Sequence, residues 1–274
     1  MAIAHIITLL ATGTGVGFAS GLLGFGGAFI MTPVQYIVFT SMGLPTDMAI
    51  KLAFGTSLLV ILPTAASGVW RHSKQGAVQW KTAIIMGSCG LAASFGGATL
   101  ATHLPGATLK LAFGALVIAG GIRMLTTQPS QIEDEPKNNP WLWVAWAIPI
   151  GFVTGVLGIG GGVLAVPVMV LALKFKIHNA VATSLAIMLF TSVGGVIGYI
   201  INGLGVPNLP AHSIGYVNLL SWFLLAVTSV GMAQVGAITA HKLPAKQLGY
   251  IFIAVMFYMG LKMLGVFDWL SWPI

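Results

Sequence analysis

Formal charge is scarce in this chain. Of its 274 residues only 6% are Asp, Glu, Lys or Arg, while 57% are hydrophobic. A soluble globular domain has about 25% charged residues, so this composition does not supply a water-facing surface. It excludes a soluble enzyme, a nucleic-acid-binding domain and a disordered chain. Long apolar runs with little strand alternation favour an all-α polytopic membrane protein over a β-barrel.

Cysteine and carboxylates are also rare. The single cysteine, Cys89, rules out a disulfide within one chain, and the histidines show no metal-binding spacing, so we expect neither metal nor cofactor. The carboxylates are Asp47, Glu133, Asp134, Glu135 and Asp268, none of them in the middle of an apolar run. Proton-coupled transporters often use a buried carboxylate as a relay, so coupling of that kind is not expected. Sodium coupling through carbonyl and hydroxyl oxygens stays open.

The apolar runs follow the same order on both sides of one polar segment. A membrane-spanning helix needs about 20 mostly apolar residues. The uncharged stretch 1–46 exceeds that length and precedes three ordinary runs, and the uncharged stretch 141–173 precedes three more. The polar, proline-containing segment 127–140 separates the two sets. We predict a first transmembrane repeat at 1–126, a linker at 127–140 and a second transmembrane repeat at 141–274.

Residue matches between the two halves support an internal repeat. The segments GFASGLLGFGGAFIMTP (17–33) and GFVTGVLGIGGGVLAVP (151–167) are identical at eight of 17 positions. Further on, Thr56-Ser57 matches Thr183-Ser184, and Gly76-Ala-Val78 matches Gly215-Tyr-Val217. Ordered matches across almost the whole half, with a proline and polar pairs among them, argue against chance similarity between glycine-rich segments.

The cations indicate that the halves are inverted relative to each other, because Lys and Arg concentrate in cytoplasmic loops. In the first half they are densest after the 52–70 run, at Arg71, Lys74 and Lys81, whereas the equivalent loop 203–215 has no Lys or Arg. We assign these cations to topology rather than to substrate binding. The expected protein lies in the inner membrane with both termini outside the cytoplasm. Each inverted-topology repeat comprises a glycine-broken helical hairpin plus three transmembrane helices.

Clustered glycines interrupt both over-long runs. Glycine inside a helix costs about 1 kcal/mol relative to alanine, so the clusters disfavour a continuous helix. A break at membrane depth leaves backbone N–H groups at a half-helix N-terminus, where they and the helix dipole favour an anion. We predict a backbone-lined substrate site at Gly24, Gly26, Gly27, Gly158, Gly160, Gly161 and Gly162. For the flanking Gly17, Gly21, Gly151 and Gly155, close helix packing is favoured.

Two features are specific enough to suggest a family. They are the duplicated GFxxGxLGxGGxxxxxP motif at 17–33 and 151–167 and the later pairs in Gly55-Thr56-Ser57 and Ala182-Thr183-Ser184. Together they resemble the TauE/SafE sulfite exporter family of membrane permeases, over essentially the full length of the chain. The resemblance implies transport of small sulfur-containing anions such as sulfite, sulfoacetate or other organosulfonates.

Polar side chains near the breaks are further candidates, because a sulfonate needs several hydrogen-bond donors at once. Hydroxyls are available at Thr56, Ser57, Thr183 and Ser184. Hydrogen bonding to the backbone of their own helix is the alternative role for these hydroxyls. Gln35 supplies an amide at a position where the second half has Met169.

The sequence therefore predicts a secondary transporter of small sulfur-containing anions that binds the anion at midplane helix breaks. An anion channel on the same scaffold and a sodium-coupled uptake permease for another small organic anion are the alternatives. An intramembrane enzyme is disfavoured, because no acid–base pair falls inside an apolar run. The expected partners are the small anion and the lipid bilayer, not nucleic acid, and monomer and homodimer both stay open.

Overall fold

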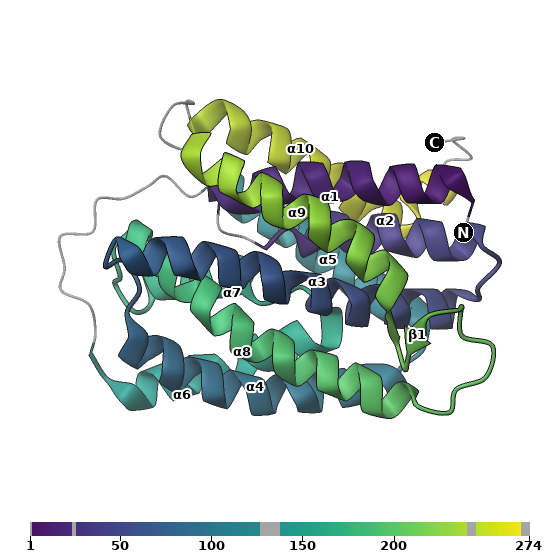
Figure 1. Ribbon diagram of the computed structural model, residues 1–274. Helices are drawn as coiled ribbons and strands as arrows, with labels where there is room; N and C mark the ends of the chain where they lie inside the picture. Colours follow the sequence, from purple (N-terminus) through teal and green to yellow (C-terminus); the bar gives the residue numbers. More distant parts are fainter. Residues whose placement is uncertain (1, 24–25, 127–137, 240–244, 270–274) are drawn as a thin grey trace.

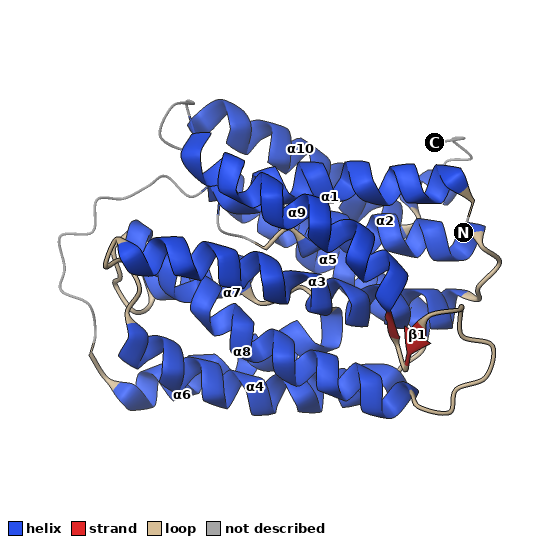
Figure 2. Ribbon diagram, viewed as in Figure 1, coloured by secondary structure: helices blue, strands red, loops and turns tan. Residues whose placement is uncertain are grey.

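The computed structural model describes residues 2–23, 26–126, 138–239 and 245–269. Gly24 and residues 127–137 of the predicted linker lie outside this described part. The described chain is almost entirely helical (Figure 2). Its first half contains α1 (Ile3–Leu23), α2 (Ala28–Ser41), α3 (Thr46–Lys74), α4 (Trp80–His103) and α5 (Gly106–Thr126). Its second half contains α6 (Pro140–Leu157), α7 (Gly162–Leu171), α8 (Ile177–Gly203), β1 (Ser213–Ile214), β2 (Val217–Asn218), α9 (Leu219–Thr239), α10 (Ala245–Leu264) and α11 (Val266–Trp269).

Seven of the described helices are long and apolar enough to cross a membrane, namely α1, α3, α4, α5, α6, α8 and α9. Many large apolar side chains on them point outward. Ile7, Phe223 and Val227 are 60%, 56% and 57% exposed, which is suited to contact with lipid tails rather than with water. The prediction of an all-α polytopic membrane protein is confirmed.

Each over-long apolar run contains one helix of spanning length and one short helix. In the first half these are α1 and α2, and in the second half α6 and α7. At 1.5 Å per residue the short helices are about 21 Å and 15 Å long, less than the roughly 30 Å thickness of a bilayer core. The glycine clusters lie at the junctions, so each run is a hairpin whose second arm begins part-way along the first.

Helices α3 and α8 form the centre of the molecule (Figure 1). Two-thirds of the apolar window of each (67%) is buried, against 33–39% for the other five spanning helices. Gly68 in the second part of α3 faces Leu185 near the start of α8, and Gly195 in the second part of α8 faces Leu58 near the start of α3. The two central helices therefore run antiparallel, with the same glycine–leucine contact made twice.

The two halves interlock through close helix contacts at glycines. Gly17 and Gly21 of α1 lie directly on the backbone of Ser229 and Ala233 of α9. The matched glycines of α6, Gly151 and Gly155, lie on Gly90 and Ser94 of α4 in the same way. Small residues at four-residue spacing allow such an approach, so these flanking glycines take the packing role expected of them. Thus α1 of the first half packs on α9 of the second, and α6 of the second half packs on α4 of the first.

The β1–β2 hairpin closes one end of the molecule. Ser213 pairs with Asn218 and Ile214 with Val217, and the Tyr216 N–H donates to the carbonyl of Tyr199 at the end of α8. Figure 1 shows this hairpin at the opposite end from the α3–α4 connection, as the antiparallel arrangement of α3 and α8 requires.

Candidate substrate site

The glycine clusters adopt backbone conformations that other residues rarely reach. Gly26 and Gly27 have φ angles of 72° and 66°, and Gly160 and Gly161 have φ angles of 77° and 81°. Positive φ is easily accessible only to glycine, so the clusters are what turns the chain from one arm of each hairpin into the other. Gly158 caps the end of α6 with φ 65° and donates from its N–H to the Thr154 carbonyl at 2.8 Å.

Both breaks end at an uncapped helix N-terminus. Gly27 is the N-cap of α2 and Gly161 the N-cap of α7, which begins at Gly162, and neither helix has a side-chain cap. The Gly27 carbonyl accepts from the third and fourth helical N–H groups, so Ala28 and Phe29 have no intrahelical acceptor. Each break therefore combines backbone N–H donors with the positive end of a helix dipole.

The two breaks meet the same pair of side chains. A Cβ on Gly26 would overlap the Met188 methyl group and lie 4.0 Å from Ile61, and a Cβ on Gly160 would overlap the Ile61 side chain and lie 3.2 Å from Met188. Ile61 lies four residues after Ser57 in α3, and Met188 lies four residues after Ser184 in α8. This pair at matched positions therefore fills the space between the breaks.

A buried cluster of three hydrogen-bonded polar side chains adjoins the first break. The Thr32 hydroxyl and the Gln35 amide both donate to Ser57 Oγ, at 3.0 Å and 2.8 Å, and all three residues are fully buried. Gln35 Oε1 has no hydrogen-bond partner among the described residues. At the matched positions of α7 the second half has Val166 and Met169. The two breaks therefore differ in polarity.

The remaining predicted hydroxyls make backbone hydrogen bonds. Thr56 Oγ1 accepts from the N–H of Asn218 at 2.9 Å, and Thr183 Oγ1 accepts from the N–H of Gln79 at 3.0 Å. Each donor lies in the opposite half from its threonine, just before a helix: Gln79 precedes α4 and Asn218 precedes α9. Each also follows directly after a matched segment, Gly76–Val78 or Gly215–Val217. Ser184 donates to the Val181 carbonyl of its own helix at 2.8 Å.

An ion pair between a buried lysine and an exposed aspartate lies near the start of α3. Lys51 Nζ lies 2.8 Å from Asp47 Oδ2, and Asp47 Oδ1 accepts from the Gly106 N–H at 2.6 Å, which joins α3 to α5. The Lys51 ammonium also lies 6.0 Å from the ring centre of Tyr216. Burial, and secondarily the negative charge of Asp47, raises the pKa of the Tyr216 phenol. Lys51 is thus paired at this end of the molecule.

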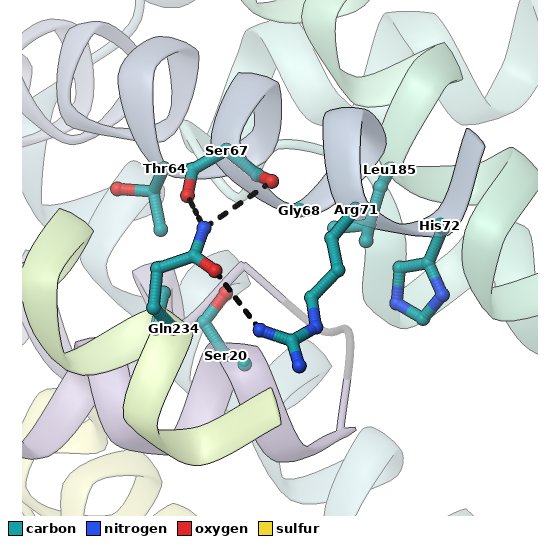
Figure 3. Close-up of a pocket in the computed structure, with 10 residues that line it drawn as sticks. Ser20, Thr64, Ser67, Gly68, Arg71, His72, Leu185 and Gln234 are labelled. Atoms are coloured by element: carbon teal, nitrogen blue, oxygen red, sulfur yellow. Dashed lines mark hydrogen bonds between the residues drawn. The ribbon is translucent and has the colours of Figure 1, made fainter. Parts of the chain in front are cut away.

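At the other end of α3 a polar pocket opens between α1, α3, α8 and α9. Its lining includes Ser20, Thr64, Ser67, Arg71 and Gln234 (Figure 3). Arg71 Nη1 donates to Gln234 Oε1 at 3.3 Å, and Gln234 Nε2 donates to the Ser67 hydroxyl. From its place at the end of an apolar run, Arg71 is expected to set membrane topology only, yet it lies in this pocket.

A family model described as "Sulfite exporter TauE/SafE" matches residues 9–263 of the chain. The chain belongs to the TauE/SafE family. A probable membrane transporter protein of Methanocaldococcus jannaschii is 32% identical over 93% of this chain and 94% of its own length. Similar proteins of Haemophilus influenzae and Bacillus subtilis, also described as probable membrane transporter proteins, are 26% and 27% identical over 94% and 96% of this chain and 97% and 99% of their own lengths. No solved structure matches the chain.

This TauE/SafE protein is accordingly a membrane transporter, with a small molecule as substrate and a lipid bilayer as surroundings. Of the predicted site residues, the fold gathers Gly26 and Gly160 around Ile61 and Met188, and places Gly27, Gly161 and Gly162 at the adjoining helix starts. It joins Gln35 to Ser57, whereas Thr56, Thr183 and Ser184 are bonded to backbone groups.

Sequence reasoning missed the apolar pair and the pocket of this TauE/SafE transporter. A signal for Ile61 and Met188 was present, because each follows a matched Thr-Ser pair at the same spacing. Thr32 was recognisable from its spacing, because it lies one helical turn before the candidate Gln35. Arg71 bonds to Gln234 of α9 and shares the pocket with residues of α1, all far from it in sequence, so no local pattern indicated them.

Proposed function

We propose that the chain is a secondary transporter of a small sulfur-containing anion, such as sulfite, sulfoacetate or another organosulfonate. The anion binds near the bilayer midplane, between the glycine breaks. One observation carries the proposal: two uncapped helix N-termini, one from each half, begin beside the same two side chains, Ile61 and Met188. The description of the matching family, sulfite exporter, supports the choice of anion.

The physical basis is that an anion can be stabilised here without a charged side chain. N–H groups at a helix start and the helix dipole both favour negative charge. On the side of the first break, Gln35 and Ser57 add an amide and a hydroxyl that are already buried. Ile61 and Met188 separate the two breaks in the described conformation, so an anion passes only after these apolar side chains move apart.

The proposed architecture is a pair of inverted repeats that work by alternating access. The antiparallel α3 and α8 and the reciprocal contacts of α1 with α9 and of α6 with α4 support it. We place both termini outside the cytoplasm of the inner membrane, since the Arg71, Lys74 and Lys81 end of the molecule is then cytoplasmic. An inside-negative potential would favour efflux of an anion by about 2.3 kcal/mol per charge per 100 mV.

Purified protein in liposomes tests the proposal. We expect saturable uptake of radiolabelled sulfite, sulfoacetate or isethionate, with an unlabelled anion on the opposite side accelerating the labelled flux. Saturable exchange of this kind distinguishes a carrier from an anion channel. Absence of flux for the whole panel, taurine included, would contradict the proposed substrate class.

The hydroxyl and amide oxygens of Thr32, Ser57 and Gln35 favour sodium coupling as a second candidate, because neutral oxygens are the ligands of hard cations. The same liposomes test it. Acceleration by an inward sodium gradient, at a fixed membrane potential clamped with potassium and valinomycin, would support a sodium-coupled permease. Equal flux with sodium and with choline would oppose it.

A further inference from the structure

The pocket at the end of α3 differs from the breaks because it contains a cation. Arg71, Ser67 and Gln234 meet there, with Ser20 of α1 facing them across the pocket (Figure 3). Ser20 is 5% exposed, although its hydroxyl is polar. Two hydroxyls, an amide and a guanidinium around one cavity are a donor set suited to an oxyanion.

Arg71 is held in place by neutral groups. Its Nη1 donates to Gln234 Oε1, and the Gln234 amide is in turn held by the Ser67 hydroxyl and, at 3.5 Å, by the Ser67 carbonyl. Among the described residues the recorded ion pair is that of Lys51 with Asp47, at the other end of α3. The guanidinium is therefore oriented by its neighbours while its positive charge is not cancelled by a described carboxylate.

One face of α3 leads from the first break to this pocket. Ser57, Ile61, Thr64, Gly68 and Arg71 follow one another at intervals of four, three, four and three residues, which places them along the same side of a helix. The first two belong to the break and the last three line the pocket. The pocket therefore lies in line with the break along the helix axis.

The matched positions of the second half carry different residues. Counted from the Thr-Ser pairs, Arg71 corresponds to Gly198 and His72 to Tyr199. Tyr199 is fully buried and its hydroxyl donates to the Val156 carbonyl at 3.2 Å, and a Cβ on Gly198 would meet Ala98 at 2.7 Å. The guanidinium of Arg71 therefore has no counterpart at the matched position of the second half.

We propose that the pocket is a binding site for the oxyanion group of the transported anion, occupied at the α3–α4 end of the molecule before or after passage through the breaks. Arg71 contacts the anion, Ser20 and Ser67 offer hydroxyls to it, and Gln234 positions the guanidinium. The inference rests on the proposed function, since it assumes that an anion is transported.

The test measures the concentration dependence of sulfite and isethionate flux, from each side separately, for wild type, Arg71→Gln, Arg71→Lys and Lys74→Gln. Lys74 is the matched control, because it lies one turn further along the same helix, is exposed and stacks 3.9 Å from the Trp70 ring centre, outside the pocket. We expect Arg71→Gln to raise KM roughly tenfold or more on the α3–α4 side, because it removes a charge-assisted hydrogen bond. Arg71→Lys keeps the charge but not the planar fork, so a smaller rise is expected.

The outcomes separate the two proposals. If wild type transports neither anion, the proposed function fails. If wild type transports and Arg71→Gln behaves like Lys74→Gln, the pocket proposal alone is overturned. Equal KM changes on both sides would also overturn it, because the site is placed at one end. Should Arg71→Gln fail to insert, Ser67→Ala and Gln234→Leu replace it, and unchanged KM in both would count against the pocket.

Discussion

Gly26 lies against Met188 across the boundary between the two halves, and Gly160 lies against Ile61 in the reciprocal way. Each break is thus closed by a side chain from the central helix of the other half. Such crossed contacts link the two halves at the place where their short helices begin. A change in the packing of α3 against α8 therefore acts on both breaks together.

The first prediction concerns this apolar pair. Met188→Ala should increase the rate of anion flux several-fold, because it removes the side chain that fills the space beside Gly26. It should also lower thermal stability in detergent, since truncation of a buried methionine costs about 2–5 kcal/mol. Flux in liposomes and melting in detergent are measured on the same preparations.

Met86→Ala is the control for Met188→Ala. Met86 is equally buried but lies in α4 and is not among the nearest neighbours of Gly26 or Gly160, so its truncation should lower stability without raising flux. Equal flux in the two variants would show that Met188 is an ordinary core residue.

Glycine substitutions at the breaks are less informative than these two variants. Alanine at Gly27 would overlap Val16 and strain a φ angle of 66°, so it would damage the fold whether or not an anion binds.

The second prediction is topological. Cysteines introduced at Gln75 and at Ala211, in a Cys89→Ser background, should react with an impermeant maleimide from opposite sides of the membrane. Both residues are exposed, Gln75 after α3 and Ala211 between α8 and the hairpin. Ala211 is preferred to Asn208, whose φ angle of 61° makes substitution costly. Labelling of both from one side would contradict the inverted arrangement.

Much of this fold could be predicted from the sequence, because a bilayer imposes simple rules. Length and hydropathy located α3, α4 and α8, and glycine clusters located the breaks, since glycine alone tolerates the positive φ angles found there. How α1 packs on α9, and α6 on α4, was not predictable. Those contacts join residues 212 positions apart for α1 and α9 and 61 positions apart for α6 and α4, and the small residues that permit them are common throughout such a chain.

The candidate site could be predicted only where its chemistry is local. A helix N-terminus depends on a few consecutive residues, so the breaks were recognisable. The partners of Ser57, Thr56 and Arg71 lie on other helices or, for Thr56, on β2, and these polar groups have no distinctive sequence pattern. From the sequence, the hydroxyls of Thr56 and Thr183 were expected either to contact the substrate or to bond to their own helix. In the structure each instead accepts a hydrogen bond from a backbone N–H far away in sequence.

The third prediction follows from that role. Thr56→Val and Thr183→Val should each lower stability by about 1–3 kcal/mol, because each leaves the N–H of Asn218 or Gln79 without its acceptor. Valine retains the shape of threonine, so helix packing is preserved. Anion affinity should be unchanged in the folded fraction. A large loss of affinity at unchanged melting temperature would instead return these hydroxyls to the substrate site.

The last prediction uses the difference between the halves. Gln35→Met introduces the residue that the second half has at the matched position, Met169, and removes an amide whose Oε1 has no described partner. Stability should change by less than about 1 kcal/mol, because the lost hydrogen bond to Ser57 is offset by relief of an unpaired buried oxygen. Anion affinity should fall roughly tenfold if the amide contacts the substrate.

Thr40→Val is the control for Gln35→Met, since the Thr40 hydroxyl lies on the same helix and its recorded bonds are to carbonyls of α2. Isothermal titration with sulfite and isethionate, alongside detergent melting, measures both quantities. Wild-type affinity in Gln35→Met would remove the polar cluster from the site and leave the backbone N–H groups of the breaks as its donors.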